Sequence, residues 1–145
     1  MISVKIKKLN ENAKLPERGS AAAAGYDVFA YLDESIELRP HETVKISTGL
    51  SVEFPEGYFM GVFARSGLAT KEGLRPSNCV GVVDSDYRGA VIVALHNDSE
   101  VTRIIEPNEK IAQLIIMPFL TWELEEVNEL SETARGGNGF GSTGR

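Results

Sequence analysis

The sequence predicts a single all-β domain, a distorted jelly-roll barrel with one short helix. Two observations support this fold class. Apolar residues alternate with polar ones at a period of two in residues 2–6 and again in residues 50–54. Short apolar runs follow one another with turn-forming residues between them, and residues 66–72 are the one plausible helix. Many short strands joined by short loops are typical of a sandwich or barrel.

Each expected strand is bounded by a turn signal. The turns are marked by Pro40, by Pro55 with Gly57, and by Pro107. A chain of 145 residues is within the size of one domain and is long enough to bury a core. We expect residues 1–134 to form this domain and residues 135–145 to form a flexible arm. The apolar runs expected as strands are residues 2–6, 50–54, 58–63, 80–83, 91–95 and 111–117.

Composition and charge exclude several classes of ligand. The net charge of −6 argues against a nucleic-acid polymer, because release of counterions requires a basic face. No apolar run approaches the ~20 residues of a membrane span, so no membrane partner is expected. A single cysteine, Cys79, suits a reducing cytoplasm (the host cytoplasm for a viral protein). We expect Cys79 to be a small buried residue and Trp122 to pack within a strand.

The last eleven residues carry the strongest chemical signal. Five of them are glycine, whose ordering costs more backbone entropy than that of any other residue. Backbone N–H groups, two hydroxyls and two arginines are the groups that surround a polyphosphate. Phe140 is the one large apolar residue. The segment is interpreted as an arm that closes over a phosphate ligand; the alternative is a disordered terminus.

Two segments in the first half of the chain combine small residues with charge. Asp27 follows Ala24 and Gly25, and its carboxylate is suited to a metal or its water shell, or to a turn. Arg65 and Ser66 follow an apolar strand and offer donors to an anion. The alternative for Ser66 is a structural N-cap of the short helix.

Two further segments follow later in the sequence. Asp84 and Asp86 are two residues apart, so on a strand they share a face that invites a metal or a raised pKa; a hairpin turn explains them equally well. Gln113 lies inside an apolar strand, where its amide needs partners from a ligand or from the backbone.

These five segments, in this order, resemble the trimeric dUTP pyrophosphatase (dUTPase) family over essentially the whole chain. The resemblance implies a jelly-roll homotrimer in which the C-terminal strand and arm are exchanged and three active sites lie between subunits. It implies hydrolysis of dUTP to dUMP and pyrophosphate, with Mg²⁺ on the phosphates, which supplies dUMP for dTMP synthesis and keeps uracil out of DNA. The motifs are residues 24–27, 65–69, 81–89, 111–114 and 135–144.

The resemblance also implies roles for individual residues at the base and the sugar. Asp84 orients and deprotonates the water that attacks the α-phosphorus. Tyr87 packs on the deoxyribose and excludes a 2′-hydroxyl. Uracil is read by the hairpin that contains Asn78, Gly81, Val82 and Val83.

Another set of roles concerns the phosphates. Gln113 bonds near the α-phosphate as part of the catalytic machinery, and Asp27 holds the water shell of Mg²⁺. Phosphates are bound by Arg65, Ser66 and Gly67. In the arm, Phe140 stacks on uracil, and the β- and γ-phosphates are contacted by Arg135, Gly141, Ser142 and Thr143.

Two alternatives accompany this interpretation. The related dCTP deaminases share the fold but carry a glutamate on the strand after the Asp-containing turn, and the matching position here is Ala94. The other alternative is a regulatory module that keeps the dUTP pocket but acts on a protein partner. The intact Asp84 and Asp27 argue against a catalytically dead copy.

Overall fold

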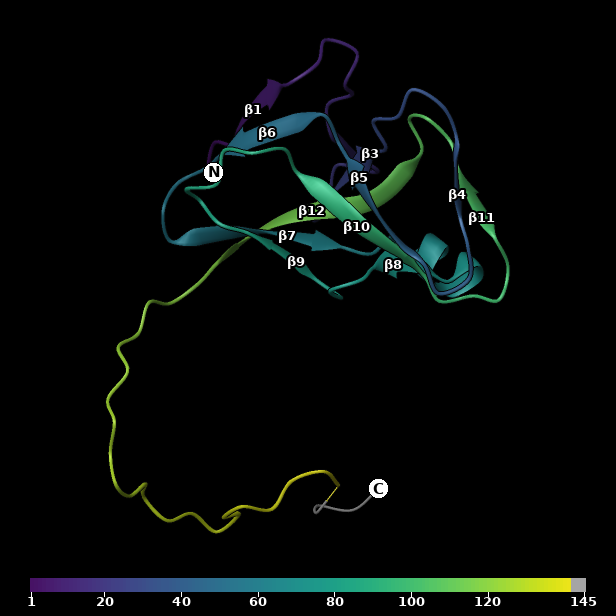
Figure 1. The fold of residues 1–145 in the computed structure, drawn as a ribbon. Helices are drawn as coiled ribbons and strands as arrows, with labels where there is room; N and C mark the ends of the chain where they lie inside the picture. Colours follow the sequence, from purple (N-terminus) through teal and green to yellow (C-terminus); the bar gives the residue numbers. More distant parts are fainter. Residues whose placement is uncertain (142–145) are drawn as a thin grey trace.

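The computed structural model of the chain describes residues 1–141 and is almost entirely β-structure (Figure 1). One short π-type helix, η1 (Leu68–Glu72), interrupts the strands within these residues. The strands are β1 (Lys5–Lys8), β2 (Glu17–Arg18), β3 (Tyr26–Phe29), β4 (Ile36–Leu38), β5 (Thr43–Ser47), β6 (Leu50–Glu53), β7 (Tyr58–Phe63), β8 (Leu74–Pro76), β9 (Gly81–Val83), β10 (Ile92–Asn97), β11 (Arg103–Ile105) and β12 (Lys110–Pro118).

The strands form four antiparallel sheets around one core. The largest has the order β2-β3-β12-β7-β9, and β5-β10-β8 form the second. Two pairs, β1-β6 and β11-β4, complete the body. β12 is the longest strand and lies between β3 and β7, so it connects the two halves of the largest sheet. This arrangement confirms the predicted all-β jelly-roll fold.

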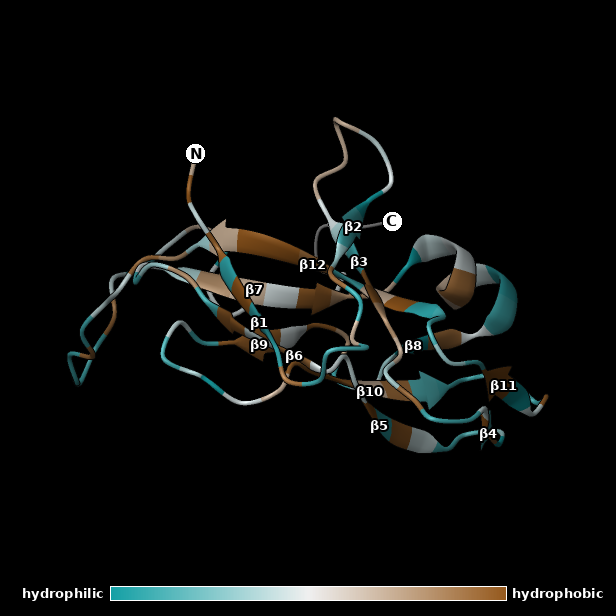
Figure 2. Cartoon of the chain, turned by 90° about the horizontal axis from the view of Figure 1, so that it is seen from above, coloured by the Kyte–Doolittle hydropathy of each residue, from teal (hydrophilic) through white to brown (hydrophobic). Residues whose placement is uncertain are grey.

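The core is built by the period-two pattern of the strands. In β10 every second residue is buried, and the strands of Figure 2 are brown where they carry these apolar residues. Leu38, Leu95 and Ile105 are completely buried, and Val28 joins them from β3. Burial of such side chains is the main favourable term in folding.

Several expected elements are confirmed. Helical backbone begins at Ser66, and η1 ends before Gly73, whose φ of 71° is the left-handed conformation that suits glycine at a helix end. β7 covers the predicted run 58–63 completely. The strands that the sequence did not predict have two to five residues each, too few to show a period: β2, β3, β4, β5, β8 and β11.

Two expectations about single residues are not met in the single chain. Cys79 is exposed rather than buried, because it lies in the connection between β8 and β9 with a φ of 62°. Trp122 does not pack in a strand: it is 77% exposed and follows the last strand of the described chain. From residue 119 onward the chain leaves the body as an extended segment (Figure 1). No helix within residues 1–141 is long and apolar enough to cross a membrane.

Candidate active site

The connection from β8 to β9 has a backbone shape fixed by hydrogen bonds. The N–H of Ser77 donates to the carbonyl of Ala94 at 2.8 Å, which ties the connection to β10. The N–H of Cys79 donates to Pro76 at 3.1 Å, and the N–H of Val80 donates to Asn78 at 2.7 Å. The last bond spans two residues, and the positive φ of Cys79 makes it possible. The Asn78 segment is therefore held in one conformation without a ligand.

A cavity of about 230 Å³ lies beside this connection. A Cβ added at Gly81 would lie 3.0 Å from the Cβ of Val62, which is a tight contact. A residue larger than glycine at this position would therefore narrow the cleft. A second cavity of about 270 Å³ shares four lining residues with the first and extends toward Lys45 and Ala94. The first cavity brings together the residues expected to bind the nucleobase and the sugar and the residue expected to act as the general base. They are Asn78, Gly81, Val82, Val83, Asp84 and Tyr87.

Asp84 and Tyr87 are placed by a tight turn. The N–H of Tyr87 donates to the carbonyl of Asp84 at 3.1 Å, and the phenol donates to the carbonyl of Ala90 at 3.0 Å. A Cβ at Gly89 would lie 2.3 Å from the Tyr87 oxygen, so glycine is required where the ring crosses the chain. Asp84 and Asp86 are exposed and lie after the end of β9. The two carboxylates lie in a turn that connects β9, which pairs with β7, to β10, which pairs with β5 and β8, so the strand interpretation and the hairpin interpretation are both wrong.

A second group of predicted residues surrounds Asp27. Asp27 lies on β3, directly opposite Gln113 on β12, so its interpretation as a turn acid is wrong. Arg65 Nε donates to Asp27 Oδ1 at 3.0 Å, and Lys110 Nζ lies 3.3 Å from Oδ2. Lys110 also lies 3.7 Å from Glu17. Lys110, which lies just before the fourth motif, is a member of this group that no pattern in the sequence indicates.

Gln113 is held by the protein itself. Its Nε2 donates to the carbonyl of Ala64 at 2.9 Å, which is the structural satisfaction considered for a buried amide. A Cβ at Gly25 would lie 2.3 Å from Gln113 Oε1, so the glycine of the first motif leaves room for this side chain. Gly25, just before β3, and Gln113 on β12 therefore fit together.

Ser66 does not cap the short helix. The residue at the cap position is Gly67, and no side chain caps the helix with a hydrogen bond. Ser66 is exposed, and its carbonyl accepts a bond from the Thr70 hydroxyl at 2.7 Å. The N-cap interpretation is wrong, and the Ser66 hydroxyl faces solvent beside Arg65.

The Asp27 carboxylate is suited to indirect contact with a cation that arrives with phosphates, whereas Arg65 and Lys110 beside it are suited to the phosphates. Within residues 1–141 no three His, Cys, Asp or Glu side chains gather as a metal site. Both oxygens of Asp27 are engaged by cationic side chains. Mg²⁺ keeps several waters and binds through one or two carboxylates together with substrate phosphates, so contact with Asp27 through water fits this arrangement.

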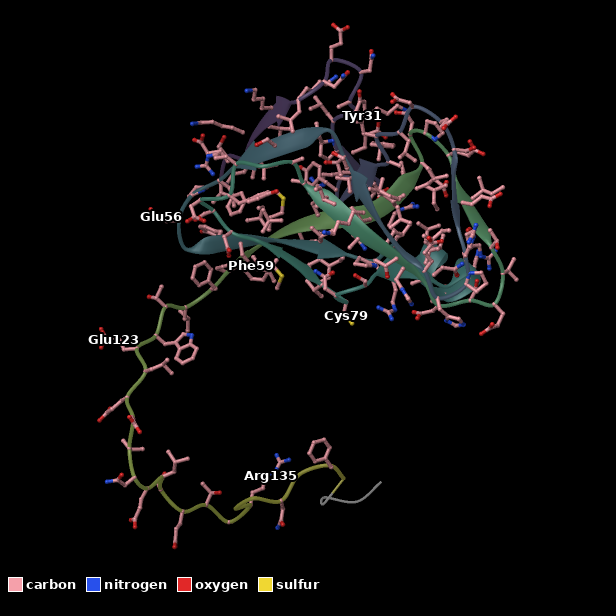
Figure 3. The ribbon with its side chains drawn as sticks, viewed as in Figure 1. Tyr31, Glu56, Phe59, Cys79, Glu123 and Arg135 are labelled. Atoms are coloured by element: carbon pink, nitrogen blue, oxygen red, sulfur yellow. The ribbon has the colours of Figure 1, made fainter. Side chains whose placement is uncertain are left out.

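The arm residues lie away from both groups in the described structure. Figure 3 shows Arg135 on the extended segment, far from Cys79 on the body. Arg135 Nε donates to the carbonyl of Asn138 at 2.8 Å, and Phe140 is fully exposed. Gly141 is also exposed. Ser142 and Thr143 lie outside the described residues.

β8 pairs with β10 and β9 with β7, so the hairpin expected around residues 78–83 is wrong. The fold and the cleft define a jelly-roll protein with a small-molecule pocket built on the connection from β8 to β9. The sequence model of the dUTPase family matches residues 11–144. The chain therefore belongs to the dUTPase family.

Named relatives and solved structures agree with this assignment. The deoxyuridine 5'-triphosphate nucleotidohydrolase of Hydrogenobaculum sp. is 47% identical over 96% of both chains. The protein of that name from Desulfitobacterium hafniense is 43% identical over 99% of both. A mutant dUTPase of Staphylococcus bacteriophage 80alpha with dUpNHpp has a TM-score of 0.84 at 31% identity, covering 99% of each chain. A mutant dUTPase of phage phi11 of S. aureus, described with a structural Mg(II) ion, has a TM-score of 0.79 at 29% identity, covering 90% of this chain and 99% of that one.

Proposed function

We propose that the protein hydrolyses dUTP to dUMP and pyrophosphate. The observation that carries this proposal is the cleft that joins Asp84 and Tyr87 to residues 78–83, at the end of the connection from β8 to β9. Family membership and relatives named deoxyuridine 5'-triphosphate nucleotidohydrolase support it. The reaction removes dUTP from the pool available to DNA synthesis and supplies dUMP for dTMP synthesis.

Asp84 is the general base of this mechanism. Its exposed carboxylate at the edge of the cleft accepts a proton from water as the water oxygen bonds to the α-phosphorus. The bond from the α-phosphorus to the bridging oxygen breaks, and pyrophosphate leaves. Gln113, oriented by Ala64 and Gly25, donates near the α-phosphate.

Selection of the uracil and the sugar rests on the connection from β8 to β9 and on β9 itself. Backbone groups around Val82 and Val83 and the amide of Asn78 line the cleft and match the O4 and N3–H of uracil. Tyr87 packs where a 2′-hydroxyl would otherwise lie. Since Ala94 occupies the position of the deaminase glutamate, the chain lacks the acid for deamination.

Phosphate binding uses the second group of residues and the arm. Arg65, Ser66 and Gly67 contact phosphates from the body, and Arg135, Phe140, Gly141, Ser142 and Thr143 close over the nucleotide. Mg²⁺ supplies charge neutralisation of the phosphates when bound. Asp27 would hold this ion by accepting hydrogen bonds from its water shell.

We also propose that the functional particle is a homotrimer. The predicted residues form two separate groups within one chain, and the first cavity includes none of Asp27, Arg65 or Gln113. A site that uses both groups is completed when two chains meet. Residues 1–134 would then form the barrel with an exchanged strand, and residues 135–145 the arm.

The segment after β12 supports exchange between chains. Leu120, Trp122 and Leu124 alternate along it, are exposed, and have no strand partner within residues 1–141. An apolar cavity of about 420 Å³ lies beside the N-terminal segment, lined by Ile2, Val4 and Ile6 among others. Lysines lie between the apolar residues of the N-terminal segment (residues 2–8), and glutamates lie between those of the segment after β12 (residues 119–134). Their opposite charges favour contact between the two segments.

One assay tests the function directly. Purified protein is incubated with dUTP, dCTP, dTTP or UTP in Mg²⁺, and pyrophosphate and ammonia are measured. We expect pyrophosphate from dUTP alone and no ammonia from dCTP. Equal turnover of UTP, or deamination of dCTP, would contradict the assignment. The single cysteine supports a reducing compartment, and we propose the cytoplasm.

A further inference from the structure

Lys110 reaches the Asp27 group because β12 contains a bulge. In the pairing with β3, Lys110 is opposite Phe29, whereas Ala112 is opposite Val28. Two steps along β12 therefore match one step along β3, and Ile111 is the extra residue. In a regular strand Lys110 and Gln113 would point to opposite faces. With the bulge, both share the face of Asp27.

The Asp27 carboxylate is held at both oxygens by this arrangement. Oδ1 accepts from Arg65 Nε at 3.0 Å, and Oδ2 lies 3.3 Å from Lys110 Nζ. Arg65 Nη1 also donates to the backbone carbonyl of Lys110 at 3.3 Å, so the Arg65 side chain contacts both Asp27 and the backbone of Lys110. The Asp27 side chain is 17% exposed and that of Lys110 is 33% exposed. Charges in such partly buried positions are screened less by solvent than surface pairs.

We propose that Lys110 is a positioning residue that fixes the orientation of Asp27. Arg65 alone holds one oxygen and leaves the carboxylate free to rotate about its last torsion. Lys110 at the second oxygen removes that freedom, so the remaining lone pairs point in fixed directions toward water. This inference rests on the proposed function, in which Asp27 accepts hydrogen bonds from the water shell of the metal.

Two other roles for Lys110 make different predictions. The first is a purely structural tie of the edge strand β2 through Glu17, which lies 3.7 Å away. The second is direct contact between the ammonium and the phosphates of the substrate. A positioning role requires Asp27, whereas neither of these roles does.

A double-mutant cycle separates these roles. The proteins are the wild type, Lys110→Met, Asp27→Asn and the double variant, with Lys110→Arg as the conservative change. Glu17→Gln removes the tie to β2 and keeps the Asp27 contact. Lys5→Met is the matched control, because Lys5 forms an exposed ion pair with Glu53 on other strands.

The readouts are kcat/KM for dUTP, the affinity for dUpNHpp in Mg²⁺ by calorimetry, and the melting temperature without nucleotide. We expect Lys110→Met to lower kcat/KM and analogue affinity about tenfold in the wild-type background. In the Asp27→Asn background the same change should have less than about a twofold effect. Lys110→Arg, Glu17→Gln and Lys5→Met should stay within about threefold of the wild type.

A tenfold loss that persists in the Asp27→Asn background would overturn the proposal in favour of direct phosphate contact. A loss reproduced by Glu17→Gln would overturn it in favour of the structural tie, and no loss would overturn it outright. The melting temperatures of the four proteins in the cycle, measured without nucleotide, test whether Asp27 and Lys110 are coupled in the free protein. If the shift of the double variant equals the sum of the shifts of the two single variants, the coupling is refuted. A wild-type protein that fails to bind dUpNHpp would instead contradict the proposed function.

Discussion

Replacing Gly89 with alanine places a methyl group against the ring of Tyr87. A Cβ at this position would lie 2.3 Å from the phenolic oxygen and 2.5 Å from Cζ. Ordinary contacts between such atoms are about 3.5 Å or longer, so the ring has to move by about 1 Å or more. The phenol then loses its bond to the carbonyl of Ala90.

The cost in stability should be small and the cost in specificity large. Tyr87 is 43% exposed, so the ring can swing toward solvent without straining the core. The lost hydrogen bond contributes about 1 kcal/mol, which lowers the melting temperature by roughly 2–4 °C. Steric discrimination against an added hydroxyl is worth about 100-fold, so displacement of the ring should lower the preference for dUTP over UTP by roughly 10- to 100-fold.

The assay compares kcat/KM for dUTP and UTP, with melting temperature measured on the same protein. Gly19→Ala is the matched control, because a Cβ there would meet no atom within 4 Å. It should leave both quantities unchanged. If Gly89→Ala kept the wild-type ratio within about twofold, Tyr87 would not be the group that excludes ribonucleotides.

Four other predictions follow from the structure. Asp84→Asn should bind dUpNHpp normally but lower kcat by ~10²–10⁴-fold, and a variant with half of the wild-type kcat would exclude the base role. Trp122, the only tryptophan, is 77% exposed in the single chain, so its emission should shift to the blue on assembly. Its replacement by alanine should weaken assembly by up to about 4 kcal/mol per chain in sedimentation, whereas unchanged association would argue against exchange of this segment. Phe140→Ala should lower kcat/KM by roughly 5- to 150-fold through loss of a base stack worth ~1–3 kcal/mol, and equal activity would leave the arm without this role. A hydrogen bond from Arg75 lowers the pKa of Asp98 below its ordinary value of 3.8. The contribution of this pair to the free energy of unfolding is therefore complete above pH 3.8 and is lost as the pH falls through the lowered pKa. Asp98→Asn should remove this part of the dependence of the melting temperature on acid pH, and an unchanged profile would argue against the pair.

The fold could be predicted where a strand is long enough to show its period. Residues 58–63 and 111–117 were recognised because mainly apolar residues continue over six or more positions. β3 was not recognised, since it has four residues and follows an alanine-rich segment. The bulge at Ile111 depends on pairing with a strand far away in the sequence, so no local pattern indicates it.

The same distinction applies to the site. Asp84 was indicated by a local pattern, two carboxylates and a glycine after an apolar strand, whereas the role of Tyr87 was implied only by the family resemblance. Lys110 was missed, since its contact with Asp27 joins positions that are far apart in the sequence. Cys79 was misjudged because residue type predicts burial on average, whereas its exposure follows from the turn that contains it.

The extended segment after β12 also has a consequence for chains that have not yet assembled. Its exposed apolar residues alternate with polar ones, as in a β-strand, in every newly made chain. Exposed segments with β-strand character can pair with copies of themselves and aggregate. Residues 120–134 contain five glutamates and no lysine or arginine. Like charges on neighbouring chains repel, so two such segments disfavour each other while each remains soluble. In the proposed homotrimer the acidic residues would therefore act as gatekeepers that leave the segment available for the body of another subunit.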